Sequence, residues 1–233
     1  MYQKFFKRFF DFTLSLLALI VLSPLLLLLC IIGAIAMQGN PFFLQPRPGK
    51  IDAKTGQEKI FKLIKFRTMS NAKDKNGNLL PDDIRLNKYG KFLRSTSLDE
   101  LPELINILIG DMSIVGPRPQ LVRDMVFMSA AQRERHSVRP GLTGLAQVNG
   151  RNNITWEEKF KWDLEYIHKG ITCFGDLKII CQTVGKVLKR SDTVREGTVS
   201  DIDFGDYLLQ KGNITEEVYI NGRQEAKELL GIK

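Results

Sequence analysis

Two neighbouring carboxylates, Asp99 and Glu100, stand directly before an apolar segment whose spacing predicts a helix. Because Pro102 lacks an N–H, we expect Asp99 to be the N-cap, which places Pro102 in the first turn, where no hydrogen bond is due. The positive end of the helix dipole then favours ionised carboxylates. An ionised carboxylate can act as a nucleophile or as a metal ligand. Ordinary helix capping by Asp is the alternative interpretation of this stretch alone.

The predicted helix has one apolar face, made of four residues at helical spacing: Leu101, Leu104, Ile105 and Leu108. Gly110 is a typical residue to end such a helix. Farther on, Pro117 and Pro119 hold Arg118 in a stiff extended segment. A rigidly presented guanidinium suits a phosphate, because its fork matches two oxygens. A surface turn is equally compatible with this spacing.

Basic residues in other segments could join Arg118 at a polyanionic ligand. A strand-like segment of mixed apolar and basic residues brings Lys65 and Arg67 near each other, and a solvated strand edge is the alternative for it. Arg94 precedes the two carboxylates, whereas Arg139 and Arg151 stand among glycines that permit close backbone approach to a ligand. Six basic residues are therefore candidates to bind a phosphate: Lys65, Arg67, Arg94, Arg118, Arg139 and Arg151.

The overall composition limits the classes of function. The 233 residues are 43% hydrophobic and 26% charged, as in a globular protein, and carry a formal net charge of +8. This charge favours a polyanionic partner, such as nucleic acid, anionic lipid or a phosphorylated substrate. The three cysteines form no disulfide framework or zinc pattern, and two distant histidines make a catalytic triad a poor candidate.

The N-terminal segment is apolar enough for a membrane. Residues 12–46 contain no Asp, Glu, Lys or Arg, and residues 14–37 within them are nearly all apolar. That apolar length suffices to cross a bilayer as a helix. Ser23 and Pro24 lie in the middle, where proline removes a backbone hydrogen bond and bends a helix. Both flanks are basic, so the positive-inside rule is satisfied if the helix re-enters the face from which it came. We predict a re-entrant helix broken at Ser23 and Pro24; a straight single span and a cleaved signal peptide are the alternatives.

Two amphipathic segments follow in the distal part. Residues 156–169 place Trp156 and Phe160 on one side with lysines beside them, and residues 178–189 repeat the pattern. Aromatic and basic residues together suit a membrane interface, whereas packing on a globular core is the alternative. The predicted fold class is therefore α+β: a membrane-embedded re-entrant N-terminal helix and a small cytoplasmic globular domain with amphipathic interfacial helices.

The chain resembles the bacterial sugar transferases, the monotopic phosphoglycosyl transferases that start glycan assembly on polyprenyl phosphate. The resemblance covers roughly residues 1–190 and its length resembles that of the short form of the family. Five features carry it in order: Ser23-Pro24, Lys65-Phe-Arg-Thr-Met69, Arg94 with Leu98-Asp-Glu-Leu-Pro102, Gly110-Asp-Met-Ser-Ile-Val-Gly-Pro-Arg-Pro119, and Val138-Arg-Pro-Gly-Leu-Thr-Gly-Leu-Ala-Gln-Val148 followed by Gly150-Arg151. The expected division is a membrane helix over residues 1–40, a catalytic domain over 41–190 and an extension of open role over 191–233.

The resemblance implies a reaction. A sugar 1-phosphate would pass from a UDP-sugar to a polyprenyl phosphate such as undecaprenyl phosphate, with release of UMP. Asp99 holds the place of the family's nucleophile and would form a covalent phosphosugar intermediate, which gives ping-pong kinetics. Glu100 would share the catalytic site, and both carboxylates would bind the implied cofactor, Mg²⁺.

The resemblance also implies a location and partners. The protein would lie on the cytoplasmic face of the bacterial inner membrane, in contact with lipids and not with nucleic acid. Self-association and contact with downstream glycosyltransferases are further expectations. Two alternatives in other classes are a membrane-tethered nucleic-acid-binding protein, for which no recognisable motif is present, and a non-catalytic assembly scaffold. The sequence leaves open which UDP-sugar is used.

Overall fold

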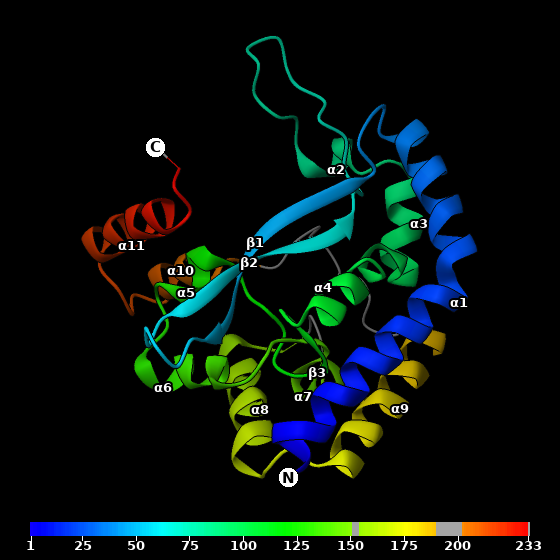
Figure 1. Cartoon of the computed structure of the whole chain (residues 1–233). Helices are drawn as coiled ribbons and strands as arrows, with labels where there is room; N and C mark the ends of the chain where they lie inside the picture. The colour runs from blue at the N-terminus through cyan, green and yellow to red at the C-terminus, as the bar shows by residue number, and fades with distance from the viewer. Residues whose placement is uncertain (151–153, 190–201, 233) are drawn as a thin grey trace.

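A long N-terminal helix lies along a small mixed domain in the computed structural model, which describes residues 1–150, 154–189 and 202–232. A π-helical turn, Tyr2–Phe6, leads into α1, Lys7–Ala36 (Figure 1). The helix continues through Pro24 but changes direction along its course, as expected of a proline kink. The Ser23 hydroxyl donates to the Ile20 carbonyl at 2.8 Å, which is the carbonyl that Pro24 leaves without an N–H partner. The predicted break is thus a bend in a continuous helix.

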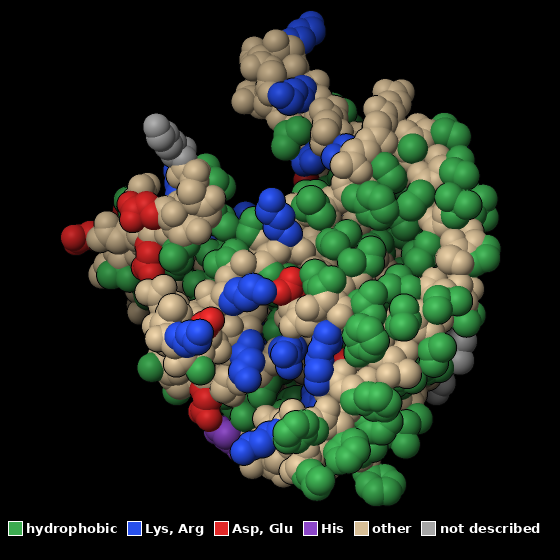
Figure 2. All heavy atoms as spheres, viewed as in Figure 1, with side chains coloured by type: hydrophobic (Ala, Val, Ile, Leu, Met, Phe, Trp, Pro, Cys, Tyr) green, Lys and Arg blue, Asp and Glu red, His purple; other side chains and the backbone are tan. Residues whose placement is uncertain are grey.

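One face of α1 packs on the domain and the other is exposed. Leu22 joins the core beside Leu104, and Leu29 joins it beside Phe66. On the outer face, Val21 is 74% exposed, and hydrophobic side chains gather along the whole helix (Figure 2). By length and composition, residues 2–36 could cross a membrane.

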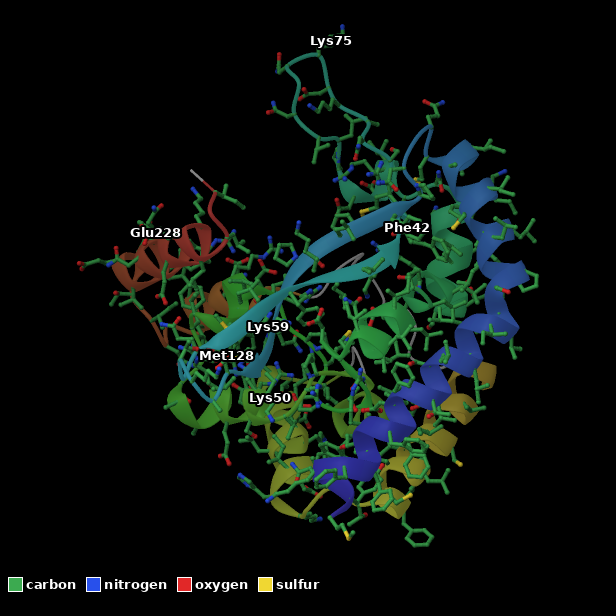
Figure 3. The ribbon with its side chains drawn as sticks, viewed as in Figure 1. Phe42, Lys50, Lys59, Lys75, Met128 and Glu228 are labelled. Carbon is green, nitrogen blue, oxygen red and sulfur yellow. The ribbon has the colours of Figure 1, made fainter. Side chains whose placement is uncertain are left out.

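A hairpin supports the domain. Strand β1, Phe42–Ile51, pairs antiparallel with β2, Glu58–Phe66, so that Phe43 lies opposite Lys65. This confirms the predicted strand around Lys65. Beyond the hairpin, a loop with Lys75 at its tip extends away from the rest of the molecule (Figure 3).

Short elements connect the hairpin to a second pair of strands. Along the chain follow α2, Asp82–Arg85; α3, Lys88–Thr96; a 3₁₀ turn, Leu98–Glu100; α4, Glu103–Ile109; β3, Ser113–Val115; α5, Val122–Met125; α6, Ala130–Arg133; a second 3₁₀ turn, Glu134–Ser137; and β4, Gly141–Thr143. Strands β3 and β4 are parallel. A Cβ added to Gly141 would lie 2.1 Å from the Gly116 nitrogen, so this glycine allows two backbone segments to meet.

The helices α7, Leu145–Val148; α8, Trp156–His168; and α9, Cys173–Lys189, follow β4. The predicted apolar face of α8 exists, but Trp156 and Phe160 pack in the core against Phe204 rather than at a membrane surface. Core packing, the alternative interpretation, is therefore correct for α8. Helix α9 differs, because Ile179 is buried while Phe174 stays 85% exposed.

The described part of the C-terminal extension, residues 202–232, forms two helices on the side of the domain away from α1 (Figure 1): α10, Phe204–Gln210, and α11, Glu216–Leu229. Phe204 is 3% exposed, and its N–H donates to Asp124 at 2.8 Å. Asp203 forms an ion pair with Arg123 at 2.7 Å. The extension is therefore packed on the domain.

Candidate active site

Asp99 and Glu100 lie in the 3₁₀ turn between α3 and α4. Ser97 adopts a left-handed conformation, with a φ of 57°, that ends α3 and starts the turn. Helix α4 begins at Glu103 with Pro102 as its N-cap. The prediction that Asp99 is the N-cap is wrong by three residues, because the chain completes a separate turn before Pro102, which cannot donate a backbone hydrogen bond. Ile105 is 37% exposed, so it does not belong to the buried face as predicted.

Asn106 fixes α4 against the hairpin. Its side-chain oxygen accepts from the Ile64 N–H at 3.0 Å, and its side-chain nitrogen donates to the Lys62 carbonyl at 2.9 Å. A buried amide that satisfies two strand groups fixes the register between helix and strand. These two hydrogen bonds place Lys65, which follows Ile64 in β2, near the start of α4. Sequence analysis missed Asn106, because a single polar residue in an apolar helix gave no signal of its partner.

Lys65 and Arg118 converge on the carboxylate of Glu100. The Lys65 ammonium lies 3.1 Å from Glu100 Oε1 and 3.1 Å from Glu103 Oε1. The Arg118 guanidinium contacts both oxygens of Glu100, with Nη1 3.4 Å from Oε2. Glu103 is 1% exposed, and burial raises its pKa. The site therefore alternates cations and carboxylates within one compact cluster.

Asp99 differs from its neighbour. It is half-buried, and its carboxylate forms no hydrogen bond or ion pair with the described residues. Burial, followed by the charge of Glu100, raises the pKa of Asp99 to about 6, although the charges of Lys65, Arg118 and Arg94 act to lower it. Desolvation thus opposes the helix dipole, yet a pKa of about 6 still leaves Asp99 mostly ionised at neutral pH. A poorly solvated carboxylate beside several cations is suited to attack phosphorus.

The remaining residues that were predicted to bind phosphate differ in their contacts. Arg94, on α3, donates from Nε to the Thr68 hydroxyl at 3.1 Å, and its charge acts on Asp99. The Arg67 side chain, two residues beyond Lys65, forms no hydrogen bond or ion pair within the described part of the chain. Arg151 lies outside the described residues.

Arg139 is not part of this cluster. Its Nε donates to the Gly110 carbonyl at 2.8 Å, at the carboxyl end of α4. Seven residues of helix, about 10 Å at 1.5 Å per residue, separate that end from the turn that holds Asp99. Arg8 donates to the Ile107 and Leu108 carbonyls at the same end. Both arginines therefore cap the negative end of the helix, a role that Gly-rich surroundings in the sequence did not reveal.

Sequence analysis also missed Arg47. Its Nη1 donates to the Pro119 carbonyl at 3.0 Å, next to Arg118. Burial, together with the charge of Arg118, lowers the pKa of Arg47 to about 10. A signal was present, because the chain contains Pro-Arg-Pro twice, at residues 46–48 and 117–119, and the structure joins the two copies.

Comparison with known proteins identifies the family. Residues 2–190 match the model of the family described as "Bacterial sugar transferase". The chain belongs to the bacterial sugar transferase family. The transferase is 46% identical over 182 residues to the "Uncharacterized sugar transferase EpsL" of Bacillus subtilis (strain 168), which covers 78% of this chain and 87% of that protein.

Two longer relatives have more informative names. The transferase is 44% identical over 191 residues to the "UDP-glucose:undecaprenyl-phosphate glucose-1-phosphate transferase" of Klebsiella pneumoniae, and 38% identical over 197 residues to the "Galactosyl transferase CpsE" of Streptococcus agalactiae serotype III (strain NEM316). Each match covers 78% of this chain, but only 40% and 42% of the two relatives. The resemblance predicted from the motifs is confirmed. The C-terminal helices α10 and α11 lie beyond the matched residues.

Proposed function

We propose that this transferase moves a sugar 1-phosphate from a UDP-sugar to a polyprenyl phosphate, with release of UMP, through a covalent intermediate on Asp99. The single observation that carries this proposal is the Asp99 carboxylate, which has no hydrogen bond or ion pair with the described residues and lies among the charges of Lys65, Arg94 and Arg118. The printed names of the relatives, which include a UDP-glucose:undecaprenyl-phosphate glucose-1-phosphate transferase, support the substrate classes.

The first half-reaction forms an acyl phosphate. A carboxylate oxygen of Asp99 attacks the sugar-bearing phosphorus of the UDP-sugar, the bond from that phosphorus to the bridging oxygen breaks, and UMP leaves with the bond's electron pair. In the second half-reaction an oxygen of the polyprenyl phosphate attacks the same phosphorus and releases Asp99 as a carboxylate. Such transfer depends on placing the nucleophile in line and neutralising the phosphate oxygens. We assign the neutralisation to Arg118 and Arg94, because the charges of both act on Asp99.

A magnesium ion fits the donor set. Magnesium commonly takes one or two carboxylates together with substrate phosphates. Asp99 has no protein partner among the described residues, so its carboxylate can serve as a ligand, whereas Glu100 is already neutralised by Lys65 and Arg118. We expect Asp99 to be the main protein ligand, with Glu100 beside it. When bound, the ion would neutralise charge on the diphosphate.

Both ends of α1 are attached to the domain, which supports a monotopic, re-entrant placement. Near the start, Asp11 accepts hydrogen bonds from the Ser113 hydroxyl at 2.7 Å and the Ile114 N–H at 2.9 Å. Near the end, the Tyr89 hydroxyl donates to the Leu29 carbonyl at 2.8 Å. A straight span would carry these polar contacts, and the domain that makes them, into hydrocarbon. In our proposal the exposed outer face of α1 enters the cytoplasmic leaflet and holds the site at the headgroups.

Activity is tested with purified full-length protein, undecaprenyl phosphate, Mg²⁺ and a panel of UDP-sugars, with UMP release as the measurement. We expect one or a few sugars to yield UMP and a lipid-linked diphosphate sugar. No UMP from any UDP-sugar, with protein whose folding is verified, would contradict the proposal.

Topology is tested with single cysteines at Gln3 and Lys50, introduced after replacement of the native cysteines and probed with an impermeant thiol reagent in oriented vesicles. We expect both positions to react from the same side. Reaction from opposite sides would contradict the re-entrant placement.

A further inference from the structure

The main chain at Arg118 is held from two directions by arginines, of which Arg135 is buried and Arg47 half-buried. Arg135 Nη2 donates to the Arg118 carbonyl at 2.7 Å. Arg47 Nη1 donates to the next carbonyl, that of Pro119, at 3.0 Å. The two donors come from different parts of the chain, one from the 3₁₀ turn after α6 and the other from β1. The carbonyls of Arg118 and Pro119 are thus both fixed, next to the Arg118 guanidinium that contacts Glu100.

Arg135 is itself fixed by an ion pair. Its Nη2 and Nε lie 2.6 Å and 3.0 Å from Asp163 Oδ2, and both residues are at most 2% exposed. Asp163 belongs to α8, so the pair connects the Arg118 segment to the core. A buried ion pair adds little stability by itself, and fixing one geometry is a better-attested use of such a pair. Lysine cannot replace this arginine fully, because one ammonium lacks the planar fork.

Among the described residues, neither Arg135 nor Arg47 forms a hydrogen bond or ion pair with the carboxylates of Glu100 or Glu103, so their hydrogen bonds reach the site through the backbone of residues 118 and 119. If residues 118 and 119 were mobile, the Arg118 guanidinium would have to be ordered each time substrate binds. A fixed backbone at these residues keeps the guanidinium in its binding position beforehand. We propose that Arg135 and Arg47 are positioning residues that hold Arg118 ready for the phosphates of the nucleotide sugar. This inference rests on the proposed function and extends it to residues outside the site.

Arg135→Lys is the principal test, measured in the full-length protein beside Arg118→Ala and the double variant. We expect the Lys variant to raise KM for the UDP-sugar about tenfold, with a smaller effect on kcat and with weaker binding of UDP. The double variant should be no worse than Arg118→Ala alone, because Arg135 acts only through Arg118. Arg47→Lys should raise KM for the UDP-sugar in the same way, and it replaces Arg135→Lys as the principal test if that variant does not fold.

Arg133→Lys is the matched control. Arg133 lies two residues away and pairs with Glu58, with its Nε 2.8 Å from Oε1, rather than with the Arg118 segment. It should lower the thermal midpoint but leave KM unchanged. A folded Arg135→Lys protein with normal KM and UDP affinity, or a double variant whose losses multiply, would overturn the positioning role.

The outcomes separate this inference from the proposed function. If the wild type binds UDP but turns over no UDP-sugar, the proposed function fails, and UDP affinity of the variants still decides the positioning role. If the wild type binds no UDP, both fail.

Discussion

The two ends of α4 use the same kinds of residue for different purposes. At the carboxyl end, Arg8 and Arg139 donate to main-chain carbonyls, which satisfies the last turn of the helix. At the amino end, Arg118 contacts Glu100, while Asp99 has no hydrogen bond or ion pair with the described residues. An arginine in a motif that suggests phosphate binding is therefore a good candidate to bind substrate only when its N–H groups do not already donate to main-chain carbonyls.

The hairpin of β1 and β2 shows a similar contrast between its two ends. Figure 3 shows Phe42 and Lys59 at its opposite ends. Lys65 lies near the Phe42 end and pairs with Glu100, whereas Lys59 pairs with Asp111 at 2.8 Å beside the carboxyl end of α4. Exposed surface pairs such as the second contribute little free energy, whereas both partners of the first are mostly buried.

The largest effect is expected from Asp99→Asn, which removes the unpartnered carboxylate. Turnover should fall at least about a thousandfold, because an amide cannot form the acyl phosphate. Steady-state UMP release measures it. Glu100→Gln is the matched control and should retain measurable activity, since Glu100 organises Lys65 and Arg118 rather than attacking. Near-normal rates for the Asn variant would break the comparison between the two ends of α4.

A smaller loss is expected from Arg118→Met, which keeps length but removes the charge. The value of kcat/KM for the UDP-sugar should fall about a hundredfold, as for removal of one group that stabilises developing charge. The thermal midpoint should fall as well, because Glu100 loses one of its two cationic partners, although the backbone bonds of residues 118 and 119 remain. A loss of less than a few fold, in protein whose folding is verified, would contradict a phosphate-binding role.

Arg67 sharpens the comparison because its side chain forms no hydrogen bond or ion pair within the described residues. We expect Arg67→Met to raise KM by roughly fivefold, the effect of one partly exposed charge contact, without lowering the thermal midpoint. Substrate titration and thermal unfolding measure the two quantities. A lowered midpoint with unchanged KM would assign Arg67 to the structure instead.

The smallest effect on turnover is expected from Arg139→Met. It removes a hydrogen bond to the Gly110 carbonyl and a cation at the helix end, so the free energy of unfolding should fall by about 1–2 kcal/mol. The kcat/KM value should stay within about twofold, because a distant cap changes little at the reacting atoms. Denaturant unfolding and kinetics together check this. A large rise in KM without a loss of stability would indicate instead that Arg139 binds substrate.

Much of this architecture could be predicted from local pattern. The apolar run predicted α1, Pro24 predicted its bend, the strand-like segment predicted β2, and Gly110 predicted the end of α4. These features depend on spacing and backbone chemistry within a short window, so the sequence suffices.

What the sequence did not reveal depends on contacts between distant residues. The hydrogen bond to Gly110 places Arg139 at the far end of α4 from Asp99, and Phe204 covers Trp156, which was predicted to be interfacial. Arg47 was overlooked because its importance comes from Pro119, which lies 72 residues away. The pKa of Asp99 likewise follows from burial that only the assembled site creates.

The central claim is most directly tested by incubating the protein with its UDP-sugar alone, labelled in the sugar-linked phosphate, in the absence of polyprenyl phosphate. The account predicts UMP release in proportion to protein, with the label on the peptide that contains Asp99 and none on the Asp99→Asn variant. Full turnover with lipid, but neither UMP nor label without it, would contradict the account and favour direct transfer between the two bound substrates.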